Sequence, residues 1–154
     1  MPAELIDGKI VSEKVRAAAA AAVAKLPGQP CLAVVLVGDD PASALYVKSK
    51  GEKTEAAGMR SITRRFPATA TQAEVEAELK TLVADPEVDG ILLQLPLPKG
   101  LNEAQALALI DPAKDVDGFH PVNVGRLASG QRALVPCTPT GSLILVKSFR
   151  PDLR

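Results

Sequence analysis

Two apolar runs in the chain have the pattern of strands that are buried on both faces. CLAVVLVG spans residues 31–38 and VDGILLQL spans residues 88–95. A continuous run of β-branched and other apolar residues is typical of a strand that helices cover on both sides. SITRRF, residues 61–66, has a weaker pattern and predicts a further, short strand. These three ranges are the strands that we expect.

Segments with helical composition or periodicity lie between and beside these runs. The expected helices are an Ala-rich stretch over residues 12–26, a segment from DDPAS to Gly58, a segment that begins at a Thr71–Glu74 capping box, and residues 103–110. The apolar stripe of the third helix consists of Val75, Leu79, Leu82 and Val83.

The alternation of strands and helices predicts the fold class. It implies right-handed βαβ units and a mostly parallel sheet, so we expect a three-layer α/β/α domain. In such sheets, ligands bind beyond the carboxyl ends of the strands. That rule selects residues 38–43, residues 94–98 and the segment after Ile110, which are also rich in polar side chains.

The last residues predict the start of another helix. Thr138 has the character of an N-cap and Pro139 that of a first helical residue, and LILVKSF follows. We therefore expect one domain over residues 1–137 and, over residues 138–154, the start of a helix that leads out of it. This arrangement suggests that the chain is a fragment of a longer protein.

Composition and charge narrow the possible partners. The 154 residues include 18 basic and 18 acidic side chains, and aromatic residues make up 3% with no Trp. A net charge of zero gives no attraction to nucleic acid or an anionic membrane, and few aromatic rings are present for base stacking. We therefore expect a small-molecule ligand and neither nucleic acid nor membrane as partner.

The cysteines, the histidine and the N-terminus exclude further classes of protein. Cys31 and Cys137 lie far apart and His120 is the only histidine, so neither a disulfide framework nor a CxxC zinc site can be built. No basic region followed by an apolar block opens the chain, and the run from Ala17 to Ala24 is too short to span a bilayer. We expect a cytoplasmic protein without a metal, in which Cys31 is a buried, small apolar residue.

The helix after the first strand carries three lysines that are not equivalent. In YVKSKGEKTEAAG, residues 46–58, Tyr46 and Lys50 are four residues apart and share a helical face, Lys53 lies near that face, and Lys48 points away. Lysines on a helix usually lie on a solvated surface. A partly desolvated lysine near a strand end could instead act as a base near neutral pH. For Lys50, the residues alone leave both interpretations open.

Two further polar positions follow strand ends. Gln94 is a primary amide in an apolar run, and leaving it unpaired would cost about 1–3 kcal/mol. It could satisfy backbone groups near the prolines of LPLP, or orient a ligand or a catalytic group. Asp117 and Gly118 are most simply a turn, although the carboxylate could bind a ligand with adjacent N–H donors. His120 has no recognisable nucleophile partner, so we interpret it as a packed or hydrogen-bonded loop residue rather than a triad member.

Four long motifs occur in an order and spacing that identify a family. They are VGDDPASALYVKSKGEKTEAAGM, GILLQLPLP, PAKDVDGFHPVNVGRL and PCTPTG, and the similarity runs from LIDGK near the start to the end of the chain. Together they resemble the FolD family of bifunctional methylenetetrahydrofolate dehydrogenase/methenyltetrahydrofolate cyclohydrolases. The resemblance implies a tetrahydrofolate derivative as substrate, NADP as cofactor, a homodimer, and a role in one-carbon metabolism and purine biosynthesis.

The resemblance also assigns the domain. Full proteins of the family have a second, Rossmann domain for NADP, so this chain resembles the N-terminal, folate-binding and catalytic domain without it. The absence of a GxGxxG motif from the sequence fits this assignment.

Individual residue roles follow from the same resemblance. It makes Lys50 the catalytic lysine, Gln94 the glutamine that positions its amine, and Tyr46 the tyrosine that lines the pterin and benzoyl part of the cleft. It thereby counts Lys50, Gln94 and Tyr46 as the catalytic residues. Asp117 becomes the carboxylate that anchors the amino and ring N–H groups of the pterin.

The residues around these positions complete the comparison with the family. Leu95 and Pro96 are implied as substrate contacts directly after the glutamine. Glu52 departs from the pattern, because many members have a basic residue two places after the catalytic lysine. Lys53 could partly substitute, or the change could be neutral on the helix exterior. The alternative function is a non-catalytic α/β module that binds a pterin or an anion.

Overall fold

The structure is a computed structural model that describes residues 5–153. In chain order its elements are α1 (Gly8–Val23), β1 (Cys31–Val37), α2 (Pro41–Ala56), β2 (Arg60–Phe66), α3 (Gln72–Ala84), β3 (Gly90–Leu93), α4 (Glu103–Leu107), α5 (Pro121–Ala128) and α6 (Cys137–Phe149).

Strand β1 lies at the centre of a parallel sheet with the strand order β2-β1-β3. In the register of this sheet, Val35 of β1 lies opposite Arg64 of β2 and Leu93 of β3. The three strands run in the same direction, so their carboxyl ends meet at one edge. The predicted parallel sheet is confirmed.

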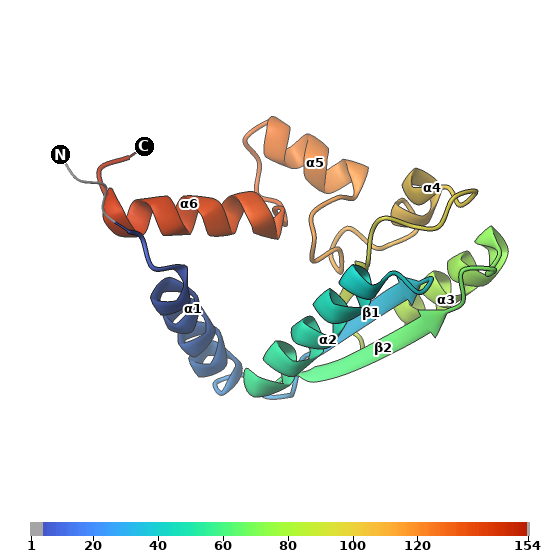
Figure 1. Cartoon of the computed structure of the whole chain (residues 1–154), viewed down its shortest axis with the longest axis horizontal. Helices are drawn as coiled ribbons and strands as arrows, with labels where there is room; N and C mark the ends of the chain where they lie inside the picture. The colour runs from blue at the N-terminus through green and yellow to red at the C-terminus, as the bar shows by residue number, and fades with distance from the viewer. Residues whose placement is uncertain (1–4, 154) are drawn as a thin grey trace.

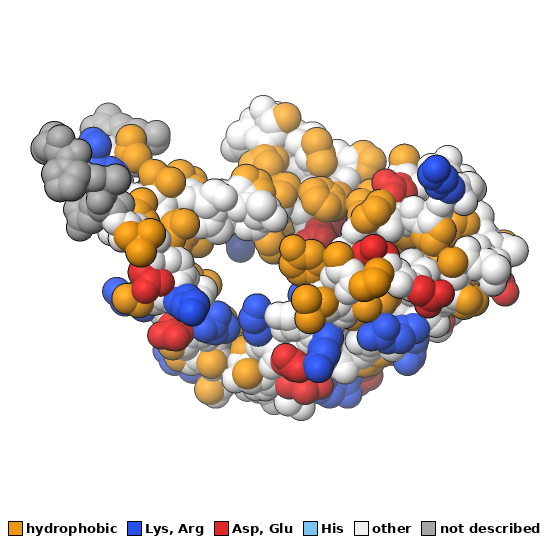
Figure 2. Space-filling view, in the orientation of Figure 1, with side chains coloured by type: hydrophobic (Ala, Val, Ile, Leu, Met, Phe, Trp, Pro, Cys, Tyr) orange, Lys and Arg blue, Asp and Glu red, His pale blue; other side chains and the backbone are white. Residues whose placement is uncertain are grey.

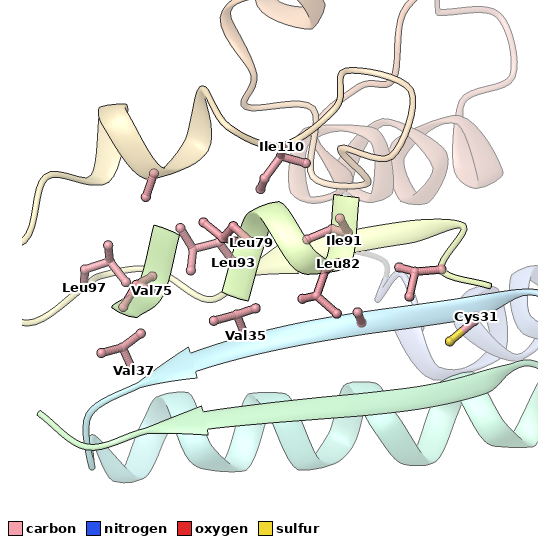
Figure 3. Packing of buried hydrophobic residues seen from close by; sticks show 13 residues of the cluster. Cys31, Val35, Val37, Val75, Leu79, Leu82, Ile91, Leu93, Leu97 and Ile110 are labelled. Carbon is pink, nitrogen blue, oxygen red and sulfur yellow. The ribbon is translucent and has the colours of Figure 1, made fainter. Parts of the chain in front are cut away.

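Helices cover both faces of the sheet (Figure 1). On one face, Val47 of α2 packs with Val34, Leu36 and Leu92 in a buried cluster. On the other face, a larger cluster fills the space between the sheet and helices α3 and α4 (Figure 3). The three-layer arrangement is therefore confirmed, and Cys31 lies in the larger cluster as a buried residue.

Helix α3 has the start and the buried stripe that were predicted. Its capping box is formed, with the backbone N–H of Thr71 donating to Glu74 Oε2 at 2.7 Å. The apolar residues at helical spacing face the core, three of them buried and Val83 partly buried. Local sequence thus determines both the N-terminus and the orientation of this helix.

Helices α1 and α6 lie beside each other, away from the sheet (Figure 1), and neither has a buried residue. The helix predicted over residues 12–26 begins earlier, because Asp7 accepts a hydrogen bond from the backbone N–H of Lys9 at 2.8 Å. It ends at Val23, four residues before Pro27, which has no N–H to donate to the carbonyl oxygen of Val23 and whose ring would clash with that carbonyl in a continued helix. Within residues 5–153, no helix combines the length and the apolar character needed to cross a membrane.

The last helix also begins earlier than predicted. The N-cap of α6 is Pro136 and its first residue is Cys137, so Thr138 is a helical residue and not the cap. Proline is tolerated at several positions of a first turn, because the N–H groups there have no partner within the helix. A proline at position 139 is therefore compatible both with a helix that begins at Pro139 and with one that begins at Cys137.

Three other elements differ from the sequence-based expectation. Strand β3 covers only Gly90–Leu93, although the backbone N–H of Gln94 still donates to Val35 O at 2.9 Å. Helix α4 ends at Leu107. Residues 108–110, which were expected to be helical, form turns instead, and Ile110 is buried there. Helix α5 was not predicted.

We predict that Leu79→Ala lowers the free energy of unfolding by about 2–5 kcal/mol, because it leaves a cavity where a fully buried side chain contacts the sheet. Leu143→Ala on α6 is the matched control, since that side chain is 52% exposed. The control should change stability by less than about 0.5 kcal/mol. Urea unfolding followed by circular dichroism measures both, and equal losses would contradict the packing described here.

Candidate active site

The turn between β1 and α2 sets the direction of the helix that carries Lys50. Gly38 has φ +90, a conformation that L side chains rarely adopt, and a Cβ there would lie 3.2 Å from the ring of Pro98. Asp40 is the N-cap of α2, and its carboxylate accepts a hydrogen bond from the backbone N–H of Ser43 at 2.7 Å. This bond lowers the pKa of Asp40 below its ordinary value. Pro41 then provides the first residue of the helix.

Lys50 and Gln94 are joined by a direct hydrogen bond. Lys50 Nζ donates to Gln94 Oε1 at 2.9 Å, from α2 to the residue that follows β3. Gln94 Nε2 donates to the carbonyl oxygen of Leu95 at 2.7 Å. The amide therefore satisfies a backbone group before the proline, as one of the two interpretations predicted, and also accepts a hydrogen bond from a lysine.

Asp117 lies on the same cavity as Lys50. Burial raises the pKa of the Asp117 carboxyl group above its ordinary value of 3.8, the nearby charge of Asp115 adds to this rise, and Lys50 opposes it. The side chain of Asp117 accepts no hydrogen bond from any of the residues 5–153 that the structure describes. It is therefore a partly buried carboxylate with unused acceptor capacity.

The cavity lined by Lys50 and Asp117 measures about 580 Å³. It lies between α1, the second half of α2, the starts of the strands at Cys31 and Gly90, and the start of α6, and Figure 2 shows it as an opening through the molecule. The expectation of a site beyond the carboxyl ends of the strands is wrong for this cavity, because α1 and the start of α6 form its walls beside the amino ends. Its walls are mainly apolar, with Val15 and Ala19 from α1 and Leu92 from β3. A mainly apolar wall with a few polar groups is typical of a small-molecule site.

Most of the other residues singled out from the sequence, Gln94 among them, do not line this cavity. Tyr46 is one turn before Lys50 on α2 and 65% exposed, and it does not line the cavity. Leu95 is partly buried, and the exposed Pro96 follows it through a cis peptide bond. Lys53 does line the cavity.

Lys48 and Glu52 lie on the exterior of α2. They are 3.9 Å apart as an ion pair, with 71% and 65% of their side chains exposed. The prediction that Lys48 is an ordinary surface residue is confirmed. Glu52 is therefore placed away from the cavity, and its difference from the family pattern does not alter the walls of the site.

His120 has a structural role. Its Nδ1 accepts a hydrogen bond from the backbone N–H of Val122 at 3.1 Å and so caps α5. The prediction of a hydrogen-bonded loop residue is confirmed. Among residues 5–153, no group of three or more His, Cys, Asp or Glu side chains is arranged to hold a metal ion.

Sequence reasoning missed three polar residues near Asp117. Asp115 and Asn123 are buried, and Asn123 Nδ2 donates to Asp115 Oδ2 at 2.9 Å. Cys137 lines the cavity; local desolvation raises the pKa of its thiol, although the residue keeps exposed surface, and the charge of Asp117 acts in the same direction. The two aspartates in DVD were visible in the sequence, but only the fold shows which one is buried.

Comparison with known proteins adds a consistent set of relatives. The family profile described as "Tetrahydrofolate dehydrogenase/cyclohydrolase, catalytic domain" matches residues 6–117. The "Bifunctional protein FolD" of Bradyrhizobium diazoefficiens is 55% identical over 99% of this chain and 53% of the relative. The protein of the same name from Hyphomonas neptunium is 60% identical over 99% of this chain and 52% of the relative. The chain thus spans about half the length of the curated relatives it matches.

Solved structures give the same picture. The bifunctional FolD methylenetetrahydrofolate dehydrogenase/cyclohydrolase from Campylobacter jejuni is 42% identical with a TM-score of 0.91, over 97% of this chain and 54% of that chain. The Trypanosoma brucei enzyme (FolD), complexed with NADP cofactor and an inhibitor, is 33% identical with a TM-score of 0.90, over 96% of this chain and 52% of that chain.

We predict that Asp117→Asn stabilises the protein relative to wild type more at neutral pH than at about pH 3. The native pKa of Asp117 lies above its unfolded value, so its contribution to stability is complete below 3.8 and is lost as the pH rises through the native pKa. Asn does not titrate, so the advantage of the variant grows with pH. Urea unfolding at several pH values measures the difference.

Asp40→Asn is a control of opposite sign. The native pKa of Asp40 is lowered below 3.8, so wild type gains stability from this residue as the pH rises from below the native pKa to above 3.8. The free energy of unfolding of the variant therefore decreases relative to that of wild type over this range. An advantage of Asp117→Asn that shrinks towards neutral pH would show that Asp117 is not desolvated.

Proposed function

The chain belongs to the tetrahydrofolate dehydrogenase/cyclohydrolase family, and we propose that it supplies the folate site and the catalytic lysine of a bifunctional enzyme. The proposed reactions are NADP-dependent oxidation of methylenetetrahydrofolate to methenyltetrahydrofolate and hydrolysis of that product to formyltetrahydrofolate. The observation that carries this proposal is the 2.9 Å hydrogen bond from Lys50 to Gln94, beside a cavity that Lys50 shares with Asp117.

Lys50 is proposed to accept a proton from the water that attacks the substrate. Methenyltetrahydrofolate is a cation, and water adds to its one-carbon bridge before the ring opens. A cation beside Lys50 disfavours the ammonium form, because like charges repel, and the neutral amine can take or relay the proton. Gln94 restricts the amine to one position, since its own Nε2 is bonded to Leu95 O.

Asp117 is proposed to bind the amino and ring N–H groups of the pterin. A carboxylate can accept two parallel hydrogen bonds from such a pair of donors, which fixes both the position and the orientation of the ring. Its unused acceptor capacity within the described chain and its place on the cavity of Lys50 support this role.

Tyr46, Leu95 and Pro96 are proposed to contact the rest of the folate. The exposed ring of Tyr46 lies one helical turn from Lys50, where it can stack against the pterin or benzoyl group. Leu95 and Pro96 follow Gln94 directly and would line the same side of the substrate.

The helix N-termini that follow β1 and β2 do not fit the pyrophosphate of NADP. These N-termini would be the places for it. The first is occupied by the Asp40 carboxylate and the second by the carboxylate of Glu74, and both would repel a phosphate. We therefore assign no residue of this chain to NADP and propose that a Rossmann domain outside these 154 residues binds it.

The proposed division of the chain places the folate-binding unit in residues 1–137 and the start of a connecting helix in residues 138–154. Helix α6 supports this division, because it has no buried residue and exposes Leu143, Val146 and Phe149. For the complete protein we propose a cytoplasmic homodimer that acts in one-carbon metabolism and purine biosynthesis.

We predict that Lys50→Met in the full-length gene product lowers the rate of methenyltetrahydrofolate hydrolysis by at least about 100-fold, because it removes the general base. Folate binding should be largely retained, since Met keeps the length and the apolar part of the side chain. Loss of methenyl absorbance measures turnover, and calorimetry with a folate analogue measures binding.

Lys48→Met is the matched control, because it lies on the same helix and points to solvent. It should hydrolyse the substrate at close to the wild-type rate. Near-native hydrolysis by Lys50→Met would remove Lys50 from the mechanism. Folate binding by a full-length wild-type protein that shows no turnover would favour the alternative, a non-catalytic pterin- or anion-binding module.

We also predict that the isolated 154-residue chain does not reduce NADP in the presence of methylenetetrahydrofolate. The reason is that both helix N-termini suited to a phosphate already hold a carboxylate. Absorbance of the reduced nicotinamide measures the reaction. Turnover by this chain alone would contradict the proposal that NADP is bound by another domain.

A further inference from the structure

The loop that carries Asp117 packs tightly against the segment before α6. Gly118 is buried and has φ +66, and a Cβ at this position would lie 2.8 Å from the carbonyl oxygen of Leu134. The same Cβ would lie 2.9 Å from the carbonyl carbon of Val135 and 3.0 Å from the nitrogen of Pro136. These neighbours are backbone atoms, which cannot move aside as a flexible side chain can. Only glycine therefore permits this contact.

A second contact joins the other side of Asp117 to the same segment. Cys137, the first residue of α6, donates its thiol hydrogen to the carbonyl oxygen of Val116 at 3.6 Å. The residues immediately before and after Asp117 are thus both held by residues 134–137.

The far end of the loop is fixed by a buried carboxylate. Asp115 Oδ2 accepts hydrogen bonds from the backbone N–H of His120 and from Asn123 Nδ2, each at 2.9 Å. Asn123 Nδ2 also donates to the carbonyl oxygen of Pro112 at 2.8 Å. The backbone is therefore anchored on both sides of Asp117, while its side chain lines the cavity that Lys50 also lines.

We propose that Gly118 is a positioning residue for the folate site: its contact with residues 134–136 holds the Asp117 carboxylate where it meets the pterin. This inference rests on the proposed function, because it assigns Asp117 to the pterin. It adds that residues 134–137, which lead into α6, contribute to the affinity for folate together with the loop that carries Asp117.

The test compares two glycines with the same backbone conformation. Gly130 has φ +72, similar to Gly118, but a Cβ there would have no atom within 4 Å. Gly118→Ala and Gly130→Ala therefore introduce similar backbone strain, and only the first also breaks the contact. Calorimetry on the full-length gene product with a folate analogue that is not hydrolysed should give a Kd about 10-fold to 100-fold higher for Gly118→Ala, the range for one misplaced charged hydrogen-bond partner. Gly130→Ala should change Kd by less than about twofold.

A double-mutant cycle tests whether Gly118 acts through Asp117. In an Asp117→Asn background, Gly118→Ala should raise Kd by no more than about twofold, because the group that it positions has already lost its charge. An equal loss of affinity in both backgrounds would overturn the proposal and indicate general damage to the site.

A ligand-free measurement separates this inference from the proposed function. NMR titration of the Asp117 carboxyl group in the wild-type chain should give a pKa above 3.8; the groups that face it are Lys50 of α2, Asp115 of its own loop and Cys137 of α6. Gly118→Ala should return this pKa towards its ordinary value, and Gly130→Ala should not. If wild type binds no folate, the proposed function fails, and the titration still shows whether Gly118 positions the Asp117 carboxyl group. If both variants titrate as wild type does, Gly118 does not position Asp117.

Discussion

Strand β1 must be buried on both faces, and the arrangement of the site depends on this constraint. Its residues alternate between the cluster under α3 and α4 and the smaller cluster under α2. Covering both faces forces the chain to cross over the sheet between strands, which makes the strands parallel and brings their carboxyl ends to one edge. Gln94 and the turn into α2 lie at that edge because of the burial of apolar residues, and not because the polar residues attract one another.

The hydrogen bond between Lys50 and Gln94 joins the two sides of this arrangement. It links residues 44 apart in sequence, from a helix on one face to the end of a strand. A hydrogen bond to a charged group contributes about 1.5–3 kcal/mol, and losing one partner would leave the other unpaired in a partly buried place. The second bond of Gln94, to Leu95 O, fixes which end of the amide faces the lysine. The Gln94 side chain thus satisfies a backbone carbonyl group directly after β3 and also accepts a hydrogen bond from the Lys50 amine.

Asp117 is positioned by a different principle. No strand or helix carries it, and its loop is held by a buried carboxylate on one side and by close backbone packing on the other. Desolvation raises the pKa of Asp117, while the charge of Lys50, which lines the same cavity, favours its charged form. The site therefore combines a lysine on a rigid helix with a carboxylate whose place depends on the start of α6.

The sequence by itself determined the features that depend on neighbours a few residues apart. The existence of strands β1 and β3, the Thr71 capping box, the buried stripe of α3 and the contrast between Lys48 and Lys50 follow from periodicity and spacing. The starts of α1 and α6 were predicted too late in the chain, because Asp7 and Pro136 are the N-caps and later residues were equally suitable as caps. Only the tertiary structure decided the contact of Lys50 with Gln94, the burial of Asp115 and Asn123, and the approach of residues 134–137 to Gly118. These contacts join segments that are distant in sequence, and local patterns carry no information about which distant group will satisfy a buried polar atom.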